Sequence, residues 1–256
     1  MSYTDRFGGI ARLYGQTGLV KLQAATVCVV GIGGVGSWAA EALARSGVGH
    51  LRLIDMDDIC ITNTNRQIHA HTGNIGREKI TAMAERIKAI NPECEIDARF
   101  AFATAENMAE CVQGVDYVID AIDSVKAKVA LIAYCKRFKI PVITTGAAGG
   151  QIDPTQVTVG DLNKTFNDPL AKKVRSLLRR DHGFSRNEKR TYGVPCVFST
   201  EQLRYPQPDG SVCQQKQFND AGVKLDCAGG FGSVTMVTGT FGFVAAARVV
   251  AKLAAD

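Results

Sequence analysis

Aromatic and charged residues are both sparse in this 256-residue chain: 7% of the residues are aromatic, one is tryptophan, and 21% are charged. Hydrophobic residues make up 46%, and the mean hydropathy is close to zero. These are ordinary values for a globular protein, and they exclude intrinsic disorder, collagen and coiled coils. The length fits one large α/β domain or a core domain with an insertion, and it allows a hydrophobic core without disulfide staples.

Paired cysteines are absent as well. None of the eight cysteines forms a Cys-x-x-Cys pair, so a zinc ribbon and a thioredoxin-like site have no support, and eight thiols are too dilute for a disulfide scaffold. The first residues, Met1–Arg6, lack the apolar stretch of a secretory signal. We therefore expect a cytoplasmic protein with reduced thiols. The cysteines are Cys28, Cys60, Cys94, Cys111, Cys135, Cys196, Cys213 and Cys227.

One stretch, residues 227–247, carries no charge and has roughly the length of a membrane span. It is rich in Gly, Ser and Thr and poor in Leu and Ile. Small residues at near-helical spacing let a helix lie close to a sheet or to another helix. We therefore expect a buried core or dimer helix here rather than a membrane span.

Apolar, β-branched runs alternate with helical patterns through the first 145 residues. This rhythm predicts an α/β fold with a Rossmann-like, doubly wound, mainly parallel sheet. We expect a single domain (1–256), with a nucleotide-binding core over about 20–160, a basic, irregular insertion or crossover at 161–226 and a glycine-rich closing helix within 227–256. The expected strands are 26–31, 50–55, 95–100, 116–120, 140–144 and 156–159, and the expected helices are 34–46, 76–90, 104–111, 124–138 and about 229–254.

A glycine-rich segment, Gly31 to Gly36, follows a predicted strand and opens a predicted helix. This is the context of a dinucleotide-binding loop, where glycines allow a tight turn, an approach of the backbone to phosphate, and close packing of helix on strand. The helix N-terminus then offers N–H donors to an anion. Asp55 ends the next strand, nineteen residues after Gly36, where its carboxylate can accept hydrogen bonds from ribose hydroxyls. The alternative is a helix turn that binds no nucleotide.

Three residues favour a nucleoside triphosphate over NAD, the usual ligand of such a loop. Arg66 follows the acidic end of the second strand, Lys79 lies at the start of the next helix, and Asp123 follows a later strand. In a doubly wound sheet all three lie at the carboxyl edge of the strands, beside the glycine loop. Two cations for phosphates and a carboxylate for Mg²⁺ suit a triphosphate attacked at phosphorus. Taken singly, they have ordinary alternatives: a surface arginine, a solvated lysine and an N-cap.

Together these segments resemble the ubiquitin-activating-enzyme-like superfamily, to which the molybdopterin- and thiamine-pathway adenylating enzymes belong and whose members adenylate carboxylates. The resemblance covers about residues 6–160 and the C-terminal helix. It implies ATP and Mg²⁺ as cofactors, a homodimer, Asp55 at the ribose and Asp123 at the magnesium ion. The residues implied at the phosphates are Asn63, Arg66, Gln67 and Lys79. The whole implied nucleotide site is Gly31, Gly33, Gly34, Gly36, Asp55, Asp57, Asn63, Arg66, Gln67, Lys79 and Asp123, with Arg66, Lys79 and Asp123 as its catalytic residues.

Further motifs along the chain are Arg6-Phe7-Gly8-Gly9, Arg12-Leu13-Tyr14-Gly15, Thr64-Asn65-Arg66-Gln67-Ile68-His69-Ala70, Gly149-Gly150-Gln151-Ile152-Asp153-Pro154-Thr155-Gln156, Cys196-Val197-Phe198-Ser199-Thr200-Glu201 and Asp226-Cys227-Ala228. With these motifs the chain resembles, nearly end to end, the family of tRNA threonylcarbamoyladenosine dehydratases. This resemblance implies ATP-dependent conversion of N6-threonylcarbamoyladenosine, beside the anticodon, into its cyclic form. A carboxylate is a poor acyl donor, but its adenylate has AMP as leaving group, and the neighbouring carbamoyl group can then close a ring at high effective molarity.

Two features depart from the molybdopterin- and thiamine-pathway members. Those proteins carry two Cys-x-x-Cys pairs for zinc, which this chain lacks. They also present an N-terminal arginine to the ATP of the neighbouring subunit, and the matching slot here holds glycine. Arg6 and Arg12 are both candidates for that contact, and the sequence does not choose between them.

Cys227 and Cys196 are the candidates for a thioester with the acyl group, as in conjugating relatives. Cys227 precedes a predicted helix start, where a thiolate can be stabilised. Ring closure has its nucleophile inside the substrate, however, so the reaction requires no thioester. We favour buried or incidental thiols at both positions.

The net charge of +5 is concentrated in one segment. Residues 172–190 hold eight basic and two acidic residues, and Lys172, Arg175 and Arg179 recur at helical spacing. We expect this segment to contact the phosphates of tRNA, with Phe166, Phe184 and Tyr192 flanking it as stacking candidates. The alternative is a solvated loop. The basic residues are Lys172, Lys173, Arg175, Arg179, Arg180, Arg186, Lys189 and Arg190.

Three other functions remain open on the sequence. The first is adenylation of the C-terminus of a sulfur-carrier protein, against which the missing zinc pairs argue. The second is a NAD-dependent dehydrogenase, favoured only by the glycine loop and Asp55. The third is a nucleotide-sensing scaffold that docks a partner protein of a sulfur-transfer system.

Overall fold

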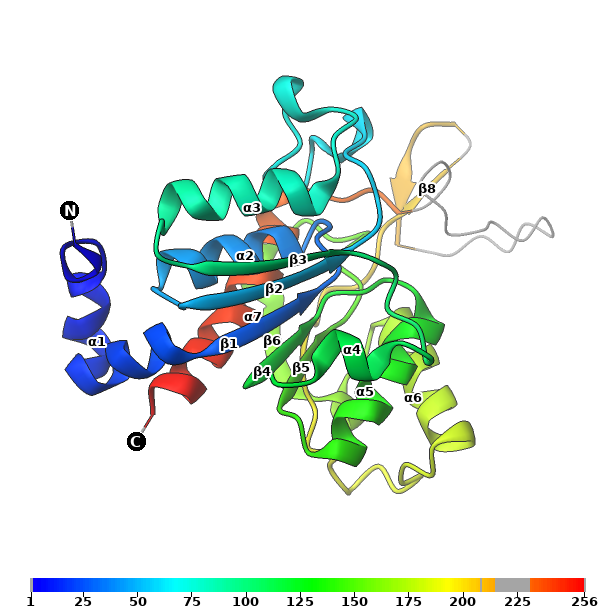
Figure 1. Ribbon diagram of the computed structural model, residues 1–256. Coiled ribbons are helices and arrows are strands. Elements are labelled where there is room, and N and C mark those ends of the chain that lie inside the picture. The colour runs from blue at the N-terminus through cyan, green and yellow to red at the C-terminus, as the bar shows by residue number, and fades with distance from the viewer. Residues whose placement is uncertain (1, 208, 215–230, 256) are drawn as a thin grey trace.

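The centre of the protein is a seven-stranded sheet with helices on both faces, shown by a computed structural model that describes residues 2–207, 209–214 and 231–255 (Figure 1). Its strands are β1 (Thr26–Val30), β2 (His50–Asp55), β3 (Glu95–Phe100), β4 (Tyr117–Asp120), β5 (Val142–Thr145), β6 (Val157–Asp161) and β7 (Pro195–Ser199). The helices are α1 (Tyr3–Ala24), α2 (Gly36–Arg45), α3 (Lys79–Ile90), α4 (Met108–Val112), α5 (Val125–Phe138), α6 (Pro169–Asp181) and α7 (Thr235–Ala254). Short 3₁₀ turns are η1 (Ile61–Asn63), η2 (Thr72–Asn74), η3 (Pro154–Gln156) and η4 (Leu162–Lys164).

The strand order in the sheet is β3-β2-β1-β4-β5-β7-β6, and only the β6–β7 pair is antiparallel. The winding direction reverses between β1 and β4, and in such sheets ligands bind beside the carboxyl ends of the strands at this switch point. The predicted Rossmann-like, doubly wound, mainly parallel fold is therefore confirmed. A separate two-stranded ribbon joins β8 (Tyr205–Pro206) to β9 (Val212–Cys213).

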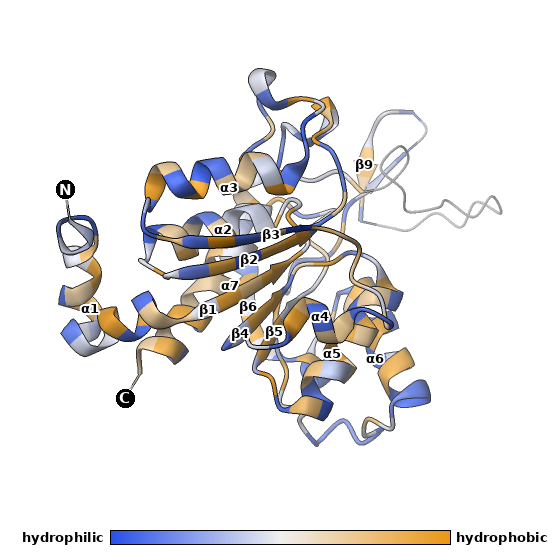
Figure 2. Ribbon diagram, viewed as in Figure 1, coloured by the Kyte–Doolittle hydropathy of each residue, from blue (hydrophilic) through white to orange (hydrophobic). Residues whose placement is uncertain are grey.

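Alternate residues of the central strands contribute to two hydrophobic cores, one on each face of the sheet. Val27 and Val29 of β1 belong to the core that includes α2, α3 and α7, whereas Cys28 and Val30 belong to the core that includes α4, α5 and α6. A strand buried on both faces requires a continuous apolar run, which is the pattern of the sequence here. Figure 2 shows the result, with hydrophobic residues gathered in the central strands and hydrophilic residues on the outer side of α3.

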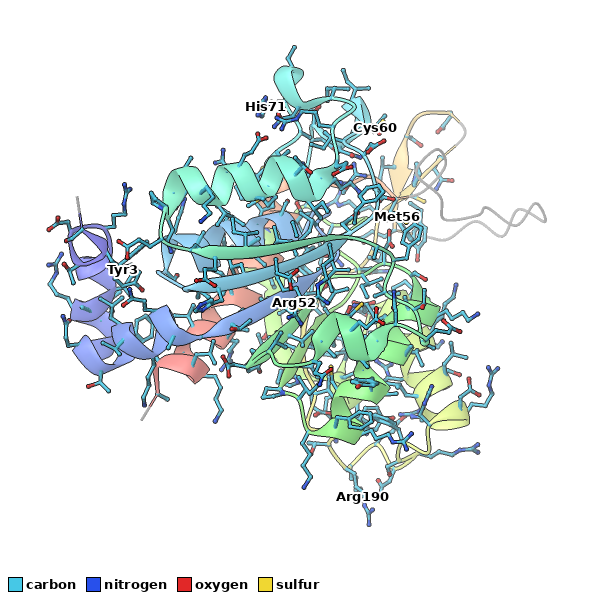
Figure 3. All side chains as sticks on the ribbon, viewed as in Figure 1. Tyr3, Arg52, Met56, Cys60, His71 and Arg190 are labelled. Carbon is cyan, nitrogen blue, oxygen red and sulfur yellow. The ribbon has the colours of Figure 1, made fainter. Side chains whose placement is uncertain are left out.

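Helix α1 extends the fold beyond the predicted elements. Its glycines obscure the helical pattern in the sequence, and Gly15 bends the helix with a positive φ of 76°. A capping box between Ser2 and Asp5 starts the helix, and Tyr3 is buried near its beginning. Figure 3 shows Tyr3 at one end of the sheet and Met56, which follows β2, at the other. Helix α1 therefore lies away from the carboxyl edge of its own sheet.

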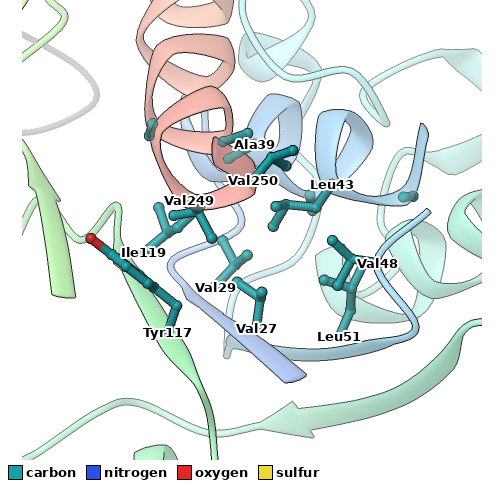
Figure 4. Packing of buried hydrophobic residues seen from close by; sticks show 14 of the residues in the cluster. Val27, Val29, Ala39, Leu43, Val48, Leu51, Tyr117, Ile119, Val249 and Val250 are labelled. Carbon is teal, nitrogen blue, oxygen red and sulfur yellow. The ribbon is translucent and has the colours of Figure 1, made fainter. Parts of the chain in front are cut away.

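Helix α7 is the one described helix with the length and hydropathy of a membrane span. It packs into the core, where Val249 and Val250 lie among residues of β1, β4 and α2 (Figure 4). A Cβ atom on Gly242 would lie 2.6 Å from the carbonyl oxygen of Val35, so only glycine allows α7 to approach α2 this closely. The expectation of a core helix is confirmed.

The segment 161–226 contains more regular structure than we expected. Helix α6 packs on the sheet through Val174 and Leu178, and β7 joins the main sheet beside β5. The helical spacing of Lys172, Arg175 and Arg179 indicated one face of α6 but not its packing on the sheet, and β7 was missed because it is a short apolar run between polar loops. Asp168 caps α6 by accepting a hydrogen bond from the N–H of Ala171 (2.8 Å) and also accepts one from the N–H of Ala147 (3.0 Å), next to the end of β5.

Candidate active site

The glycine loop lies between the end of β1 and the start of α2, at the switch point of the sheet. Gly31 has a φ of 89°, and a Cβ atom on it would lie 2.8 Å from the carbonyl oxygen of Ala121. A Cβ atom on Gly36 would lie 1.7 Å from the carbonyl oxygen of Gly31. Both positions therefore require glycine. The loop touches the segment that follows β4, which is the segment that carries Asp123.

Asp55 fixes the other side of the glycine loop. One carboxylate oxygen accepts a hydrogen bond from the N–H of Ile32 (2.6 Å), and the other accepts one from the N–H of Asp57 (2.9 Å). The Asp55 side chain is 9% exposed, at the carboxyl end of β2. The carboxylate predicted to bind ribose is thus fixed at the end of β2, beside the glycine loop.

Lys79 is a buried residue of the site rather than a solvated helix position. Its side chain is 7% exposed at the first turn of α3, with Nζ 2.6 Å from the Asp57 carboxylate and 3.9 Å from Asp55. A buried ammonium group requires such partners, because burial without a counter-charge is very costly. Asp57, which the resemblance implied as a nucleotide-binding residue, is the ion-pair partner of Lys79 in this structure.

Arg66 follows η1 and lies against the glycine loop, where a Cβ atom on Gly34 would meet its Cγ and Cδ atoms at 3.3 Å. Its guanidinium donates hydrogen bonds to the carbonyl of Thr62 (2.8 Å) and to Asn65 Oδ1 (3.0 Å). The Arg66 backbone is held as well, since Trp38 Nε1 donates to its carbonyl oxygen (2.9 Å). The structure thus brings Arg66 to the glycine loop, as the sequence predicted.

The other two residues implied at the phosphates, Asn63 and Gln67, are buried in the same turn. Asn63 Oδ1 accepts a hydrogen bond from the N–H of Cys60 (3.0 Å), so Asn63 holds the turn together. Gln67 Nε2 faces Gly33, and Gln67 Oε1 has no hydrogen-bond partner in the described part of the chain. Asn65 was not among the predicted residues. Its side chain donates to the carbonyl of Ser233 (2.7 Å), which ties the Arg66 turn to the entrance of α7.

Asp123 lies between β4 and α5, two residues after Ala121, and its side chain is exposed. Its carboxylate forms no hydrogen bond or ion pair with the other described residues. No group of three or more His, Cys, Asp or Glu side chains in residues 2–207, 209–214 and 231–255 is placed to hold a metal ion. Mg²⁺ commonly binds one or two carboxylates together with substrate phosphates, so a single exposed Asp123 fits an ion completed by the triphosphate.

Lys128 is a buried charged residue that the sequence analysis missed. Its ammonium group lies 2.9 Å from the carboxylate of Asp120 at the end of β4, and both side chains are buried. Thr144 of β5 donates a hydrogen bond to the same carboxylate (2.6 Å). This network joins α5, β4 and β5 at the end of β4, where the segment that leads to Asp123 begins. A lysine among the apolar residues of α5 was the available signal.

Of the two candidate cysteines, Cys196 lies in β7 and is fully buried. Burial raises the pKa of the Cys196 thiol far above its ordinary value. A thiol in this environment stays protonated and is a poor nucleophile. Cys227 lies outside the described residues.

Most of the predicted tRNA-contacting residues line one hollow of about 980 Å³ on α6 and the loop after it, which we call the basic hollow. Arg179 is held there by Tyr192 (2.9 Å) and Asn163 (2.8 Å), and Tyr192 is buried, so the expectation that Tyr192 stacks on a base is wrong. Arg190 lines a second hollow and lies at the opposite end of the molecule from Cys60 and His71 (Figure 3). The predicted residues in the basic hollow are Lys172, Arg175, Arg179, Arg180, Arg186 and Lys189.

A doubly wound sheet with a glycine loop, a strand-end carboxylate and a buried lysine at its switch point defines a Rossmann-like, nucleotide-binding α/β protein. Comparison with models of protein families shows which family within this class the chain belongs to. The family model of the ThiF family matches residues 8–255, and the chain belongs to this family. The resemblance to adenylating proteins of this superfamily is confirmed.

Two relatives that share the same name match this chain over nearly its whole length. It is 58% identical to the tRNA threonylcarbamoyladenosine dehydratase of Escherichia coli (strain K12), a match that covers 99% of this chain and 95% of that protein. It is 54% identical to the protein of the same name from Haemophilus influenzae, covering 98% and 94%. A crystal structure of the E. coli tRNA N6-threonylcarbamoyladenosine dehydratase in complex with ATP has a TM-score of 0.87 and 55% identity, covering 98% and 94%.

Proposed function

We propose that this protein is an ATP-dependent tRNA-modifying enzyme that dehydrates N6-threonylcarbamoyladenosine to its cyclic form. The observation that carries the proposal is the contact of Arg66 with the glycine loop, in a chain whose full-length relatives bear that name. Lys79 pairs with Asp55, which accepts the N–H of Ile32 in that loop, and the segment that leads to Asp123 touches Gly31. We assign Asp55, at the carboxyl end of β2, to the ribose. A Cβ atom on Gly33 would have only Gln67 Nε2, at 3.9 Å, within 4 Å, which leaves the backbone there accessible to a phosphate.

The reaction proceeds in two steps. The threonyl carboxylate attacks the α-phosphorus of ATP, which forms an acyl-adenylate and releases pyrophosphate. The carbamoyl group then attacks the acyl carbon, loses a proton and expels AMP, so the nucleoside loses one water overall. Arg66 and Lys79 stabilise the charge that develops on the polyphosphate. A magnesium ion held by Asp123 would supply further charge neutralisation to the phosphates.

The decisive experiment uses pure protein, ATP, Mg²⁺ and tRNA that carries the linear modification. Nucleoside mass spectrometry is expected to show the loss of one water from the modified adenosine. Pyrophosphate release triggered by a sulfur-carrier protein, with no change in the nucleoside, would instead support the alternative adenylating function.

We further propose that the basic hollow holds the tRNA. The double variant Lys172→Ala/Lys189→Ala removes two exposed cations from its rim. We expect weaker tRNA binding and a slope of log K against log salt that falls by about two, because each phosphate contact contributes about one. ATP affinity should not change. Lys88→Ala on α3 is the control, and an equal loss of tRNA binding in that variant would contradict the assignment.

Cys196 is expected to play no part in the chemistry. Its thiol is fully buried and protonated, so Cys196→Ala should cyclise the substrate at nearly the wild-type rate with a modest loss of stability. The rate is measured by the nucleoside assay and the stability by thermal unfolding. Cyclisation that disappears in Cys196→Ala, while ATP still binds and the variant remains folded, would restore a covalent role for this cysteine.

A homodimer in the cytoplasm completes the proposal. Met236 and Phe243 of α7 are exposed, at 59% and 47%, and Leu13 of α1 is exposed at 78%, which supports an apolar contact with a second copy. In such a dimer Arg6 or Arg12 of α1 is the candidate for reaching the partner's ATP. We also propose, on the resemblance of the sequence alone, that the protein docks a partner protein of a sulfur-transfer system.

A further inference from the structure

Two side chains, Asp55 at the end of β2 and His69 in the segment after η1, hold the backbone of Ile32 in the middle of the glycine loop. The N–H of Ile32 donates to Asp55 Oδ2 (2.6 Å), and the carbonyl oxygen of Ile32 lies 3.0 Å from His69 Nε2. The Ile32 side chain is fully buried and adds no freedom of its own. The orientation of this short backbone stretch is therefore set from both directions.

His69 is neutral in this position and donates from Nε2. A carbonyl oxygen can only accept, so Nε2 must carry the proton that makes this contact. The side chain is 1% exposed, and its Nδ1 atom has no hydrogen-bond partner among the described residues. Burial lowers the pKa of His69, and the nearby charges of Lys79 and Arg86 act in the same direction, while the hydrogen bond with the Ile32 carbonyl and the charge of Asp55 oppose them.

The contact to the Ile32 carbonyl decides where the next N–H points. The peptide between Ile32 and Gly33 is planar and trans, so its C=O and its N–H point in opposite directions. With the carbonyl turned toward buried His69, the N–H of Gly33 is turned to the opposite side. That N–H donates to no other group in the described part of the chain, which leaves it available to an anion.

We propose that His69 is a positioning residue that fixes the Ile32–Gly33 peptide so that the Gly33 N–H faces the phosphates of ATP. His69 does not touch the nucleotide itself. It acts through the loop, together with Asp55, which holds the neighbouring peptide from the other side. This inference rests on the proposed ATP-dependent function.

The test compares His69→Leu, His69→Gln and His69→Asn by calorimetric titration with ATP. We expect His69→Leu to weaken ATP binding between about fivefold and a hundredfold, the equivalent of one unmet hydrogen bond to a buried carbonyl. His69→Gln keeps an N–H donor at the reach of Nε2 and should restore most of the affinity. The side chain of His69→Asn is one bond shorter, so its N–H donor does not reach the carbonyl, and this variant should not recover the ATP affinity. His71→Gln is the matched control, because His71 is exposed nearby, and it should bind ATP as the wild type does.

Thermal unfolding of the same variants separates positioning from a purely structural role. A lower melting temperature for His69→Leu with unchanged ATP affinity would overturn the inference, and so would equal losses of affinity in the Gln and Asn variants. If His69→Leu does not fold, the comparison of Gln with Asn decides alone. A wild-type protein that binds no ATP would overturn the proposed function together with this inference, whereas failure confined to the variants would leave that function intact.

Discussion

Arg66→Ala is expected to slow adenylation severely while leaving the protein folded. The Arg66 guanidinium makes hydrogen bonds only within its own turn, to Thr62 and Asn65, and no ion pair within the described residues, so its removal should hardly change stability. The variant would lack the cation that stabilises the negative charge developing on the polyphosphate in the transition state. Removing one such electrostatic contact typically lowers a rate by about 10²–10³-fold. Pyrophosphate release in the presence of modified tRNA measures the effect, and thermal unfolding verifies the fold.

Arg77→Ala provides the matched control for this prediction. Arg77 lies just before α3 and pairs with Glu85, away from the glycine loop. Its loss should leave turnover within about twofold of wild type, since exposed ion pairs contribute little. Asp123→Ala should behave as Arg66→Ala does, with a defect that higher Mg²⁺ concentrations partly relieve. Wild-type rates in Arg66→Ala or Asp123→Ala would refute the assignment of these residues to the phosphates and the metal.

Lys128→Met is expected to destabilise the fold strongly. It leaves the Asp120 carboxylate buried at the end of β4 with Thr144 but without its counter-charge. Breaking a buried ion pair on one side costs about 3–5 kcal/mol, much of it the cost of the uncompensated charge. The free energy of unfolding in urea measures this loss. The double variant Asp120→Asn/Lys128→Met removes both charges and should recover a large part of the stability.

Lys126→Met, two residues earlier on α5, is the control for Lys128→Met. Lys126 is exposed, and its replacement should change the free energy of unfolding by less than about 0.5 kcal/mol. A loss below about 1 kcal/mol in Lys128→Met, or a double variant no more stable than the single one, would show that the buried pair does not stabilise this part of the fold.

The features that the sequence predicted well are those encoded locally. The glycine loop requires a tight turn between one strand and one helix, and its neighbours in the chain reveal both. Asp55 ends an apolar strand, so the parallel sheet carries it to the carboxyl edge together with Asp123. The α/β rhythm predicted these strands without any knowledge of distant contacts, which is why the predicted core of the fold agrees with the structure.

The features that the sequence did not reveal depend on partners far along the chain. The burial of Lys128 depends on Asp120 and Thr144, and the contact of His69 is with a carbonyl 37 positions earlier in the chain. Helix α1 was missed because its glycines weaken the helical pattern in the sequence. The helix nevertheless forms, since tertiary packing outweighs the low helix propensity of glycine. In each case tertiary contacts decide the conformation or the ionisation state, and no periodicity in the sequence records them.

The concentration of charge at the basic hollow has a kinetic consequence. Residues 172–190 carry a net charge of +6 in a protein of +5, so the remainder of the chain is close to neutral. The molecule is therefore an electrostatic dipole, with its positive pole over α6 and the loop that follows it. A polyanion that approaches from any side experiences a torque as well as an attraction, and it turns that pole toward itself before contact. The charge distribution thus orients the protein relative to the polyanion before contact. This orienting effect weakens at higher salt, because dissolved ions screen the charges.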